Sequence, residues 1–444
     1  MYWQTPLDHT IKKASLLTSK TVDKAKLEAW LGCYRDEAPT SSNIGSANVP
    51  FQRWFRFKEA FSPKFVTDTI AATPYKVRSC LDPFCGSGTT VLTTRFLGID
   101  SIGIEVNPFV ADLARAKTSY LSPSKISKEL AHIVKNTGTR KYSNTKKWMT
   151  PSTFREPGKN GRWIFSSEVF DTCMFLRKRI DNIKDRKMAR LLRVLLGSAL
   201  VKNSNVAVNG KGRKYKKNWK ERESNSTDLI ESFEQAVSLA ISDLEKFDIS
   251  NNVSSKILLG DARKRLGRID RADIAIFSPP YPNSFDYTDV YNIELWMLGY
   301  LTSYDANRVL RKNTLRSHVQ IKWPRRLSSV QSHKLQIVLQ ALSENRKNLW
   351  NSNIPEMIAH YFVDLQVVFK HLHRILPTNG RAIAAIGDSQ YASVHIDVGG
   401  ILEEVVGSIG FHLIEKGDIR SMRNSAQHGG SLELSEHCLV FKKV

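Results

Sequence analysis

The chain has no closely spaced cysteine pair and no apolar segment long enough to cross a membrane. Its five cysteines are scattered over 444 residues without a Cys-x-x-Cys motif. Zinc sites and disulfide frameworks need such spacing, so we expect no metal and no structural disulfide, which suits a reducing cytosol. The longest apolar run, residues 191–201, is too short for a membrane span and contains Arg193. No signal peptide opens the chain, and we expect a cytoplasmic protein without membrane contact.

Acidic residues are scarce relative to basic ones. The chain has 66 lysines and arginines against 43 aspartates and glutamates, a formal charge of +23, and an isoelectric point near 9.7. This excess suits a polyanionic partner, although a generally basic soluble protein has the same composition. The clustering of the basic residues therefore has to decide between these interpretations.

Two common nucleotide-binding motifs are also missing, although one glycine-rich loop is present. Residues 82–89 read Asp-Pro-Phe-Cys-Gly-Ser-Gly-Thr, between a predicted strand and a predicted helix at residues 91–97. No Gly-Lys-Ser/Thr follows, which excludes a P-loop, and the missing Gly-x-Gly-x-x-Gly weakens the case for a nicotinamide dinucleotide. The glycines still allow close backbone approach, and the helix N-terminus offers N–H groups to a carboxylate.

Two further strand ends carry polar residues of interest. The predicted strand at residues 101–105 ends in Glu105, and an acid in this place of a strand–helix–strand unit typically binds ribose hydroxyls. A predicted buried strand at residues 272–277 leads directly into Ser-Pro-Pro-Tyr at residues 278–281. Proline lacks an N–H group, so these carbonyls stay free to accept hydrogen bonds, and the ring can stack on a flat heterocycle. The tetrapeptide suits holding a nucleobase amino group, although Pro-Pro-Tyr alone is more often a turn.

Together, these motifs resemble the S-adenosylmethionine-dependent DNA methyltransferases that modify cytosine N4 or adenine N6. The resemblance covers roughly residues 51–122 and 253–444, and it includes residues 56–63 and a third strand ending at residues 258–262. It implies an α/β, Rossmann-like methyltransferase fold with a mixed seven-stranded sheet. The strand-like runs at residues 411–415 and 437–441 would form its terminal antiparallel pair.

The resemblance also implies roles for individual residues. The expected catalytic residues are Ser278, Pro279, Pro280 and Tyr281. The expected S-adenosylmethionine site consists of Phe61, Ser62, Pro63, Asp82, Pro83, Phe84, Gly86, Gly88, Thr89, Glu105 and Asp261. In this family the glycine loop holds the methionine part of the cofactor. The acid matching Glu105 holds the ribose, and the acid matching Asp261 contacts the adenine.

The implied reaction is direct methyl transfer to a base that has left the duplex. Hydrogen bonds from its amino group to Ser278 Oγ and the Pro279 carbonyl would aim the nitrogen lone pair at the methyl group, with Tyr281 stacked on the base. The cytosine-C5 class needs a Pro-Cys pair, which this chain does not contain. Serine at the first position of the tetrapeptide favours cytosine N4, and adenine N6 is the alternative.

A large insertion interrupts the predicted catalytic core. Apolar residues at helical spacing predict helices at residues 169–183, 187–201 and 228–247, so the insertion is mostly helical and long enough to be a domain. We expect it to recognise the target sequence. The predicted parts are an N-terminal extension (1–50), the cofactor-binding first part of the core (51–122), the helical insertion (123–252) and the second part of the core (253–444) with a basic loop (302–354).

Positive charge is concentrated in two segments. Residues 211–222 combine seven basic residues with Tyr215 and Trp219, and residues 308–326 hold seven basic residues and no acid. Charge runs are usually solvated faces, but beside a base-binding tetrapeptide they favour nucleic-acid binding. The expected contacts are Arg213, Lys214, Lys216, Lys217, Trp219, Arg311, Lys312, Arg316, Arg325 and Arg326. We expect double-stranded DNA as the partner, in the nucleoid of a prokaryotic cytoplasm, with a cognate restriction endonuclease as a possible second partner.

Two other functions stay open at this point. RNA amino-methyltransferases use similar Pro-Pro-Tyr segments, usually preceded by Asn or Asp, and a DNA-binding subunit without activity could keep the fold. The intact cofactor and tetrapeptide motifs argue against the second. Asp286, Tyr287, Asp289 and Asp388 are weaker candidates for the border of the target pocket, and Cys85 is expected to be only a small residue within the glycine loop.

Overall fold

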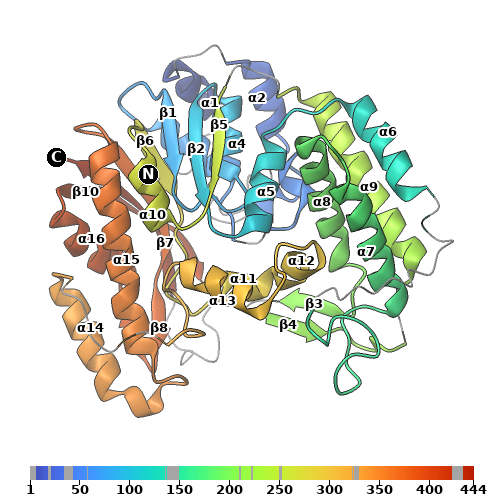
Figure 1. The fold of residues 1–444 in the computed structure, drawn as a ribbon. Coiled ribbons are helices and arrows are strands. Elements are labelled where there is room, and N and C mark those ends of the chain that lie inside the picture. Colours follow the sequence, from blue (N-terminus) through green and yellow to red (C-terminus); the bar gives the residue numbers. More distant parts are fainter. Residues whose placement is uncertain are drawn as a thin grey trace.

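A seven-stranded mixed sheet forms the centre of the molecule (Figure 1). The strands, in their order across the sheet, are β10 (Phe411–Met422), β11 (Leu434–Lys443), β7 (Arg381–Gly387), β6 (Ile274–Phe277), β1 (Ser79–Asp82), β2 (Asp100–Glu105) and β5 (Ser255–Leu259). The last five are parallel, and β11 runs antiparallel to both β7 and β10. The predicted methyltransferase-type sheet with a terminal antiparallel pair is confirmed. The computed structural model describes residues 7–18, 22–34, 44–57, 59–135, 137, 150–209, 212–221, 224–249, 253–322, 324, 330–422 and 434–444.

Helices cover both faces of this sheet because its strands are apolar on both sides. In β6, Ile274 and Ile276 join one hydrophobic cluster, and Ala275 and Phe277 join the other. The first cluster includes α3 (Pro63–Ala71), α4 (Thr89–Phe96) and α5 (Pro108–Lys117), and the second includes α15 (Ile354–Ile375) and α16 (Val398–Gly407). Asn107 caps α5, since its side chain accepts hydrogen bonds from the N–H groups of Phe109 (3.0 Å) and Val110 (3.3 Å).

The N-terminal helices pack on the same core. They are α1 (Leu7–Leu16) and α2 (Lys24–Leu31). The fully buried Trp30 of α2 stacks on Phe96 of α4, with ring centroids 4.2 Å apart. The described part of the N-terminal segment is therefore tied to the part of the sheet that contains β1 and β2.

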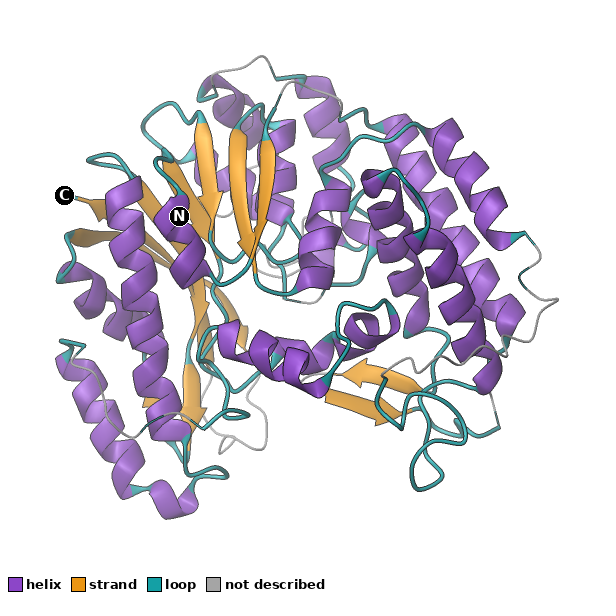
Figure 2. Cartoon of the chain, viewed as in Figure 1, coloured by secondary structure: helices purple, strands orange, loops and turns teal. Residues whose placement is uncertain are grey.

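The insertion contains the three predicted helices and a hairpin that the sequence analysis missed. Its elements are α6 (Pro123–Val134), α7 (Ser167–Asp181), α8 (Arg186–Leu200), β3 (Val206–Asn209), β4 (Gly212–Tyr215) and α9 (Ser226–Lys246). Figure 2 shows the hairpin as strands beside the ends of these helices. Charged residues in β4 conceal the alternation of apolar and polar side chains that is typical of a strand, so the sequence predicts only a basic segment there. The helix α8 lies close against α5, because a Cβ atom on Gly197 would meet the Phe109 ring at 2.8 Å.

The segment 302–354 is not simply a basic loop as predicted. It contains α13 (Tyr304–Asn313) and α14 (His333–Glu344), and α11 (Tyr287–Val290) and α12 (Asn292–Met297) precede it. The helix α13 has few apolar residues, which hides its periodicity, but Ser303 caps it by accepting a hydrogen bond from the Ala306 N–H group at 3.0 Å. Within the described ranges, no helix has the length and apolar character required to cross a bilayer.

Candidate active site

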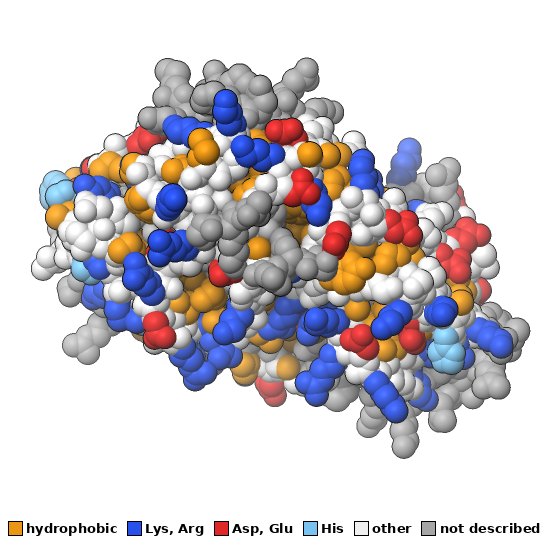
Figure 3. Space-filling model, turned by 90° about the horizontal axis from the view of Figure 1, so that it is seen from above, with side chains coloured by type: hydrophobic (Ala, Val, Ile, Leu, Met, Phe, Trp, Pro, Cys, Tyr) orange, Lys and Arg blue, Asp and Glu red, His pale blue; other side chains and the backbone are white. Residues whose placement is uncertain are grey.

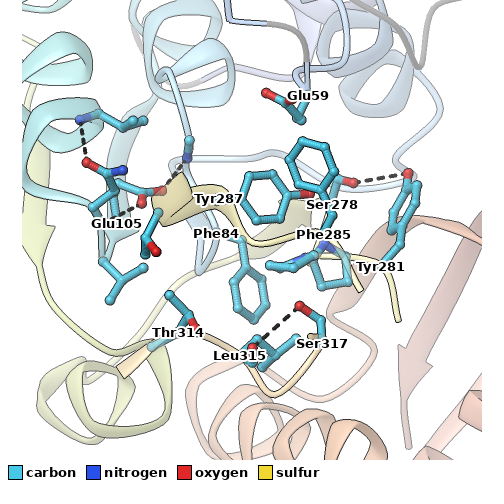
Figure 4. A pocket seen from close by; sticks show the side chains of 18 of the residues that line it. Glu59, Phe84, Glu105, Ser278, Tyr281, Phe285, Tyr287, Thr314, Leu315 and Ser317 are labelled. Atoms are coloured by element: carbon cyan, nitrogen blue, oxygen red, sulfur yellow. Dashed lines mark hydrogen bonds between the residues drawn. The ribbon is translucent and has the colours of Figure 1, made fainter. Parts of the chain in front are cut away.

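The carboxyl ends of β1, β2, β5 and β6 open into a cavity of about 300 Å³ (Figure 4). Ligands of open parallel sheets bind at this edge. Of the residues predicted from sequence, the lining includes Pro83, Phe84, Gly86, Glu105, Asp261, Ser278, Pro279, Pro280 and Tyr281. The structure therefore brings the glycine loop, the predicted ribose acid and the Ser-Pro-Pro-Tyr tetrapeptide to one site.

Backbone N–H groups hold the carboxylate of Glu105 in place. Its Oε2 accepts a hydrogen bond from the Gly86 N–H group (2.9 Å), and its Oε1 accepts one from the Asn107 N–H group (2.7 Å). Burial raises the pKa of Glu105 to about 7. The side chain thus presents a fixed acceptor to the cavity, and it changes charge near neutral pH.

The glycine loop needs its glycines for conformation and space. Gly88 has a φ of +86°, and a Cβ atom there would lie 2.8 Å from the Cβ of Ala114 on α5. Gly88 is followed by the first turn of α4, and the N–H groups of a first helical turn have no partner within the helix. Asp82, Gly88 and Thr89 themselves lie outside the cavity lining. Asp82 is buried behind the loop and accepts a hydrogen bond from the Phe84 N–H group at 2.9 Å.

Asp261 begins α10 (Ala262–Arg265) and is paired with an arginine. Its carboxylate accepts hydrogen bonds from Arg263 Nε (2.8 Å) and Nη2 (2.9 Å), and Arg263 Nη1 also reaches Asp364 of α15 (2.7 Å). This bidentate contact fixes the orientation of Asp261 at the cavity, and the carboxylate oxygens retain lone pairs for a further donor.

The segment before the glycine loop contributes different residues from those predicted. Phe61, Ser62 and Pro63 do not line the cavity; Ser62 caps α3 by accepting a hydrogen bond from the Phe65 N–H group at 3.1 Å. Phe57 and Glu59 line it instead. Phe57 stacks on Tyr291 at 5.2 Å, and the Tyr291 hydroxyl donates to Glu59.

At the other end of the cavity, the tetrapeptide is connected to a carboxylate that the sequence analysis missed. Ser278 Oγ donates a hydrogen bond to Tyr281 Oη (3.3 Å), and Tyr281 Oη donates to Glu436 on β11. Burial, followed by the charge of Glu436, raises the pKa of Tyr281 well above its usual range. The one available signal for this residue was an acid two positions before the apolar run 438–441 of β11.

Segment 313–318 forms a further wall that was not predicted. Thr314, Leu315, Ser317 and His318 line the cavity, and Figure 4 shows Thr314, Leu315 and Ser317 across from Phe84. Arg263 Nη2 donates to the Thr314 carbonyl at 3.2 Å, which ties this wall to the residue that holds Asp261.

The weaker candidates lie in distinct environments. Asp286 caps α11 by accepting a hydrogen bond from the Thr288 N–H group (2.9 Å), while Tyr287 lines the cavity. Asp388 lies outside the lining and contacts His395 at 3.1 Å. Cys85 packs against β2, where a Cβ atom on Gly103 would lie 2.6 Å from its sulfur. No group of three or more potential metal ligands occurs among the residues that the structure describes.

The predicted nucleic-acid residues divide into exposed and internally paired groups. Lys214, Lys217 and Lys312 are exposed, and so is Arg213, although its guanidinium has a partner. Arg213 donates to the Asn292 side chain (3.1 Å), Lys216 to the Lys202 carbonyl (2.9 Å), and Trp219 packs on Tyr215 and Trp163. Arg325 and Arg326 lie outside the described residues.

Two arginines of the segment 308–326 are paired with acids from other parts of the chain. Arg311 forms ion pairs with Asp286 and Asp289, and Arg316 forms one with the buried Asp364. The absence of acid within the segment was therefore misleading, and these two side chains give little support to the predicted phosphate clamp. Figure 3 shows lysines and arginines spread over one face with acidic groups between them, so net charge alone does not locate a binding surface.

A second, wider cavity of about 620 Å³ lies beside the hairpin of the insertion. Its lining consists of Thr153, Lys159, Asn160, Arg162, Ile164, Val206, Arg213 and Tyr215, which include three cations and no acid. The Arg162 guanidinium lies 5.9 Å from the centroid of the Tyr215 ring. Cations next to an aromatic ring suit contact with a polyanion that also carries flat bases.

Comparisons with known proteins find similarity to methyltransferases. Residues 5–116 match the family of N6/N4 methyltransferases described as DNA methylase. The Type II methyltransferase M.AvaI of Nostoc sp. is 26% identical over 425 residues, which cover 86% of this chain and 84% of that protein. The Type II methyltransferase M.BsoBI of Geobacillus stearothermophilus is 26% identical over 429 residues, covering 86% and 83%.

A solved structure of the rRNA methyltransferase aviRa from Streptomyces viridochromogenes aligns over 95% of this chain and 94% of that one. Its TM-score of 0.29 and sequence identity of 9% are too low to indicate a shared substrate or fold. The sequence comparisons and the sheet order carry the assignment instead. Together with the match of residues 5–116 to the DNA methylase family, they identify the chain as an amino-methyltransferase, as its motifs predicted.

Proposed function

We propose that this enzyme transfers a methyl group from S-adenosylmethionine to N4 of a cytosine that has flipped out of double-stranded DNA. The observation that carries the proposal is the single cavity that joins the glycine loop, Glu105 and the Ser-Pro-Pro-Tyr tetrapeptide. The relatives are named Type II methyltransferases, which supports DNA as the substrate and a restriction endonuclease as the functional partner.

The residues at the strand ends fit the cofactor. The N-terminus of α4 offers backbone N–H groups to its carboxylate, and Glu105, held by the Gly86 N–H group, offers a fixed acceptor to ribose hydroxyls. Asp261 offers a carboxylate to the adenine amino group. Bound S-adenosylmethionine supplies the electrophilic methyl group; the protein supplies the orientation.

The tetrapeptide positions the base for direct transfer. Ser278 Oγ and the Pro279 carbonyl accept hydrogen bonds from the amino group, which favours a tetrahedral nitrogen with its lone pair directed at the methyl group. The rings of Tyr281 and Tyr287 line the same cavity. Flipping the base out of the duplex costs a few kcal/mol, which stacking on Tyr281 helps to offset.

The choice of cytosine depends on the first residue of the tetrapeptide. Serine resembles the N4-cytosine enzymes, whereas many N6-adenine enzymes have Asp or Asn in this position. Adenine N6 is therefore the alternative target of the same chemistry. The helical insertion, with its cation-lined cavity at Arg162 and Arg213, is proposed to contact the DNA and to contribute to sequence recognition.

One experiment tests the proposal as a whole. The purified protein is incubated with labelled S-adenosylmethionine and either unmethylated genomic DNA or total RNA, and the modified nucleoside is identified after digestion. N4-methylcytosine in DNA is the expected product. N6-methyladenine would contradict the choice of base but not the chemistry, and label confined to RNA would contradict the choice of nucleic acid. Protein with Tyr281→Ala serves as the inactive control.

A further inference from the structure

The hydroxyl groups of the tetrapeptide form a chain of hydrogen bonds with one direction. Ser278 Oγ donates to Tyr281 Oη at 3.3 Å, and Tyr281 Oη donates to Glu436 Oε1. Glu436 is 2% exposed and lines the cavity. An ionised carboxylate accepts hydrogen bonds but donates none, so it sets the direction of the whole chain.

The position of Glu436 is fixed by the sheet. It lies on β11, directly opposite Gly387 of β7, while the next side chain, His437, contacts Asp388 at 3.4 Å. Glu436 therefore reaches the tetrapeptide from a strand that is 155 positions away from Tyr281 in the sequence. This placement depends on the antiparallel pairing of the last strand.

We propose that Glu436, acting through Tyr281, makes Ser278 Oγ an obligatory acceptor and takes up the proton that the target amino group releases. The proposal rests on the proposed function. Because the Ser278 proton is committed to Tyr281, Ser278 Oγ has only lone pairs to offer an entering base. It accepts a hydrogen bond from an amino group, and it repels the carbonyl oxygen that uracil and thymine carry in the same position.

The same chain completes the proton balance of the reaction. The nitrogen lone pair forms the new N–C bond as the S–C bond breaks, with its electron pair passing to sulfur. The methylated nitrogen then carries a positive charge and one surplus proton. That proton passes to Ser278 Oγ as the Ser278 proton moves to Tyr281 Oη and the Tyr281 proton moves to Glu436. The products are a neutral methylamino group and a carboxylic acid, which returns its proton to solvent after product release.

Two variants that keep the shape of the site test the chain. Tyr281→Phe retains the stacking ring and removes the middle hydroxyl, and Glu436→Gln retains the volume and removes the proton acceptor. We expect each to lower the single-turnover rate of methylation by about 100-fold, which is typical of a lost proton acceptor. The double variant should be no slower than either single variant, because both interrupt one chain. Cofactor affinity should stay within about threefold of wild type, since neither residue is at the cofactor end.

Tyr300→Phe is the matched control. The Tyr300 hydroxyl donates to the carboxylate of Asp112 at 2.9 Å, a comparable tyrosine–carboxylate pair that does not line the cavity. We expect its single-turnover rate, normalised to folded protein, to equal that of wild type. An equally slow control would show that the loss in Tyr281→Phe is a general effect of packing, and it would overturn the proposal.

The direction of the chain has its own measurement. Binding is compared for DNA with cytosine or uracil at the methylated position, in wild type and in Tyr281→Phe. We expect the preference of wild type for cytosine to fall about tenfold in the variant, because the freed Ser278 proton can then be donated to a carbonyl. An unchanged preference would overturn the acceptor role, and full single-turnover rates in both variants would overturn the proton path. Absence of methylation by wild type would instead contradict the proposed function, and the inference with it.

Discussion

The two ends of the active-site cavity are built in different ways. At the cofactor end, Gly86, Glu105 and Asn107 come from neighbouring segments of the chain and are joined by backbone N–H groups. At the target end, Ser278 and Tyr281 depend on Glu436, which reaches them only through the pairing of the last strand with β7. Local sequence thus determines the geometry of the proposed cofactor end, whereas tertiary structure determines the geometry of the proposed target end. Substitutions at the two ends should therefore separate binding from catalysis.

The largest effect is expected at the target end. Tyr281→Ala removes both the stacking ring and the hydroxyl that links Ser278 to Glu436. We expect turnover to fall by about 1,000-fold, from lost stacking and a lost proton path together. Affinity for S-adenosylmethionine, measured by calorimetry, should change by less than about threefold, because Tyr281 lies at the other end of the cavity. A loss of cofactor affinity in proportion to the loss of turnover would mean that the two ends are not independent.

The reverse separation is expected at the cofactor end. Gly88→Ala places a side chain at a φ of +86° and 2.8 Å from the Ala114 Cβ. We expect about 1–3 kcal/mol of lost stability and a roughly tenfold weaker cofactor, because the start of α4 must shift. Thermal unfolding and calorimetry measure the two losses.

Gly407→Ala is the control for this variant. Gly407 ends α16, where an added Cβ atom would meet nothing within 4 Å and the backbone has no positive φ. Its substitution should leave both stability and cofactor affinity close to wild type. If the two glycine variants behaved alike, the close approach of the loop to α5 would not be what requires Gly88.

The same division explains what could be predicted from the sequence. Gly86, Glu105 and residues 278–281 were found because consecutive residues at strand ends create their local geometry. Glu436 was missed because its role arises from a strand pairing that no local pattern encodes. The segment before the glycine loop reaches the cavity through Phe57 and Glu59 instead of the predicted Phe61, because segment similarity does not define which side chains turn inward.

Arg311 and Arg316 were assigned a role that the structure does not support, whereas Glu436 was missed. Their own segment lacks acids, so they were expected to contact phosphates, yet Asp286 and Asp364 neutralise them from other elements. Local charge density overestimates the charge that a folded surface presents.

The sheet order was predictable because the order of motifs along the chain defines the family topology, whereas the hairpin β3–β4 carries no such motif.

A smaller effect is expected from pH at the cofactor end. Burial raises the pKa of Glu105 to about 7, so this carboxyl is mostly protonated at pH 6 and mostly ionised at pH 8. The ionised form is the stronger acceptor for ribose hydroxyls, so cofactor affinity should rise with pH through this range, by about fivefold. Calorimetry at pH 6, 7 and 8 measures the trend.

Glu105→Gln identifies the group responsible for this trend. Asp82 also has its pKa raised to about 7 by burial, but it lies behind the loop. The Glu105→Gln variant should bind the cofactor weakly, and its affinity should depend little on pH. If the dependence persisted in Glu105→Gln, Asp82 would be its source, and the assignment of Glu105 to the ribose would lose its support.

The smallest effects are expected on the surface around the target end, where the two basic segments differ. Lys214 and Lys217 are exposed, so replacing both with glutamate should weaken binding to all DNA sequences and reduce the steepness of log affinity against log salt by about 0.9 per lost phosphate contact. Arg311→Gln should leave that slope unchanged and lower thermal stability instead, because it leaves the buried Asp286 without its ion pair. Binding titrations at several salt concentrations distinguish the two variants. A reduced salt slope for Arg311→Gln would show that segment 308–322 contacts DNA. An unchanged salt slope for the lysine variant would show that the hairpin does not.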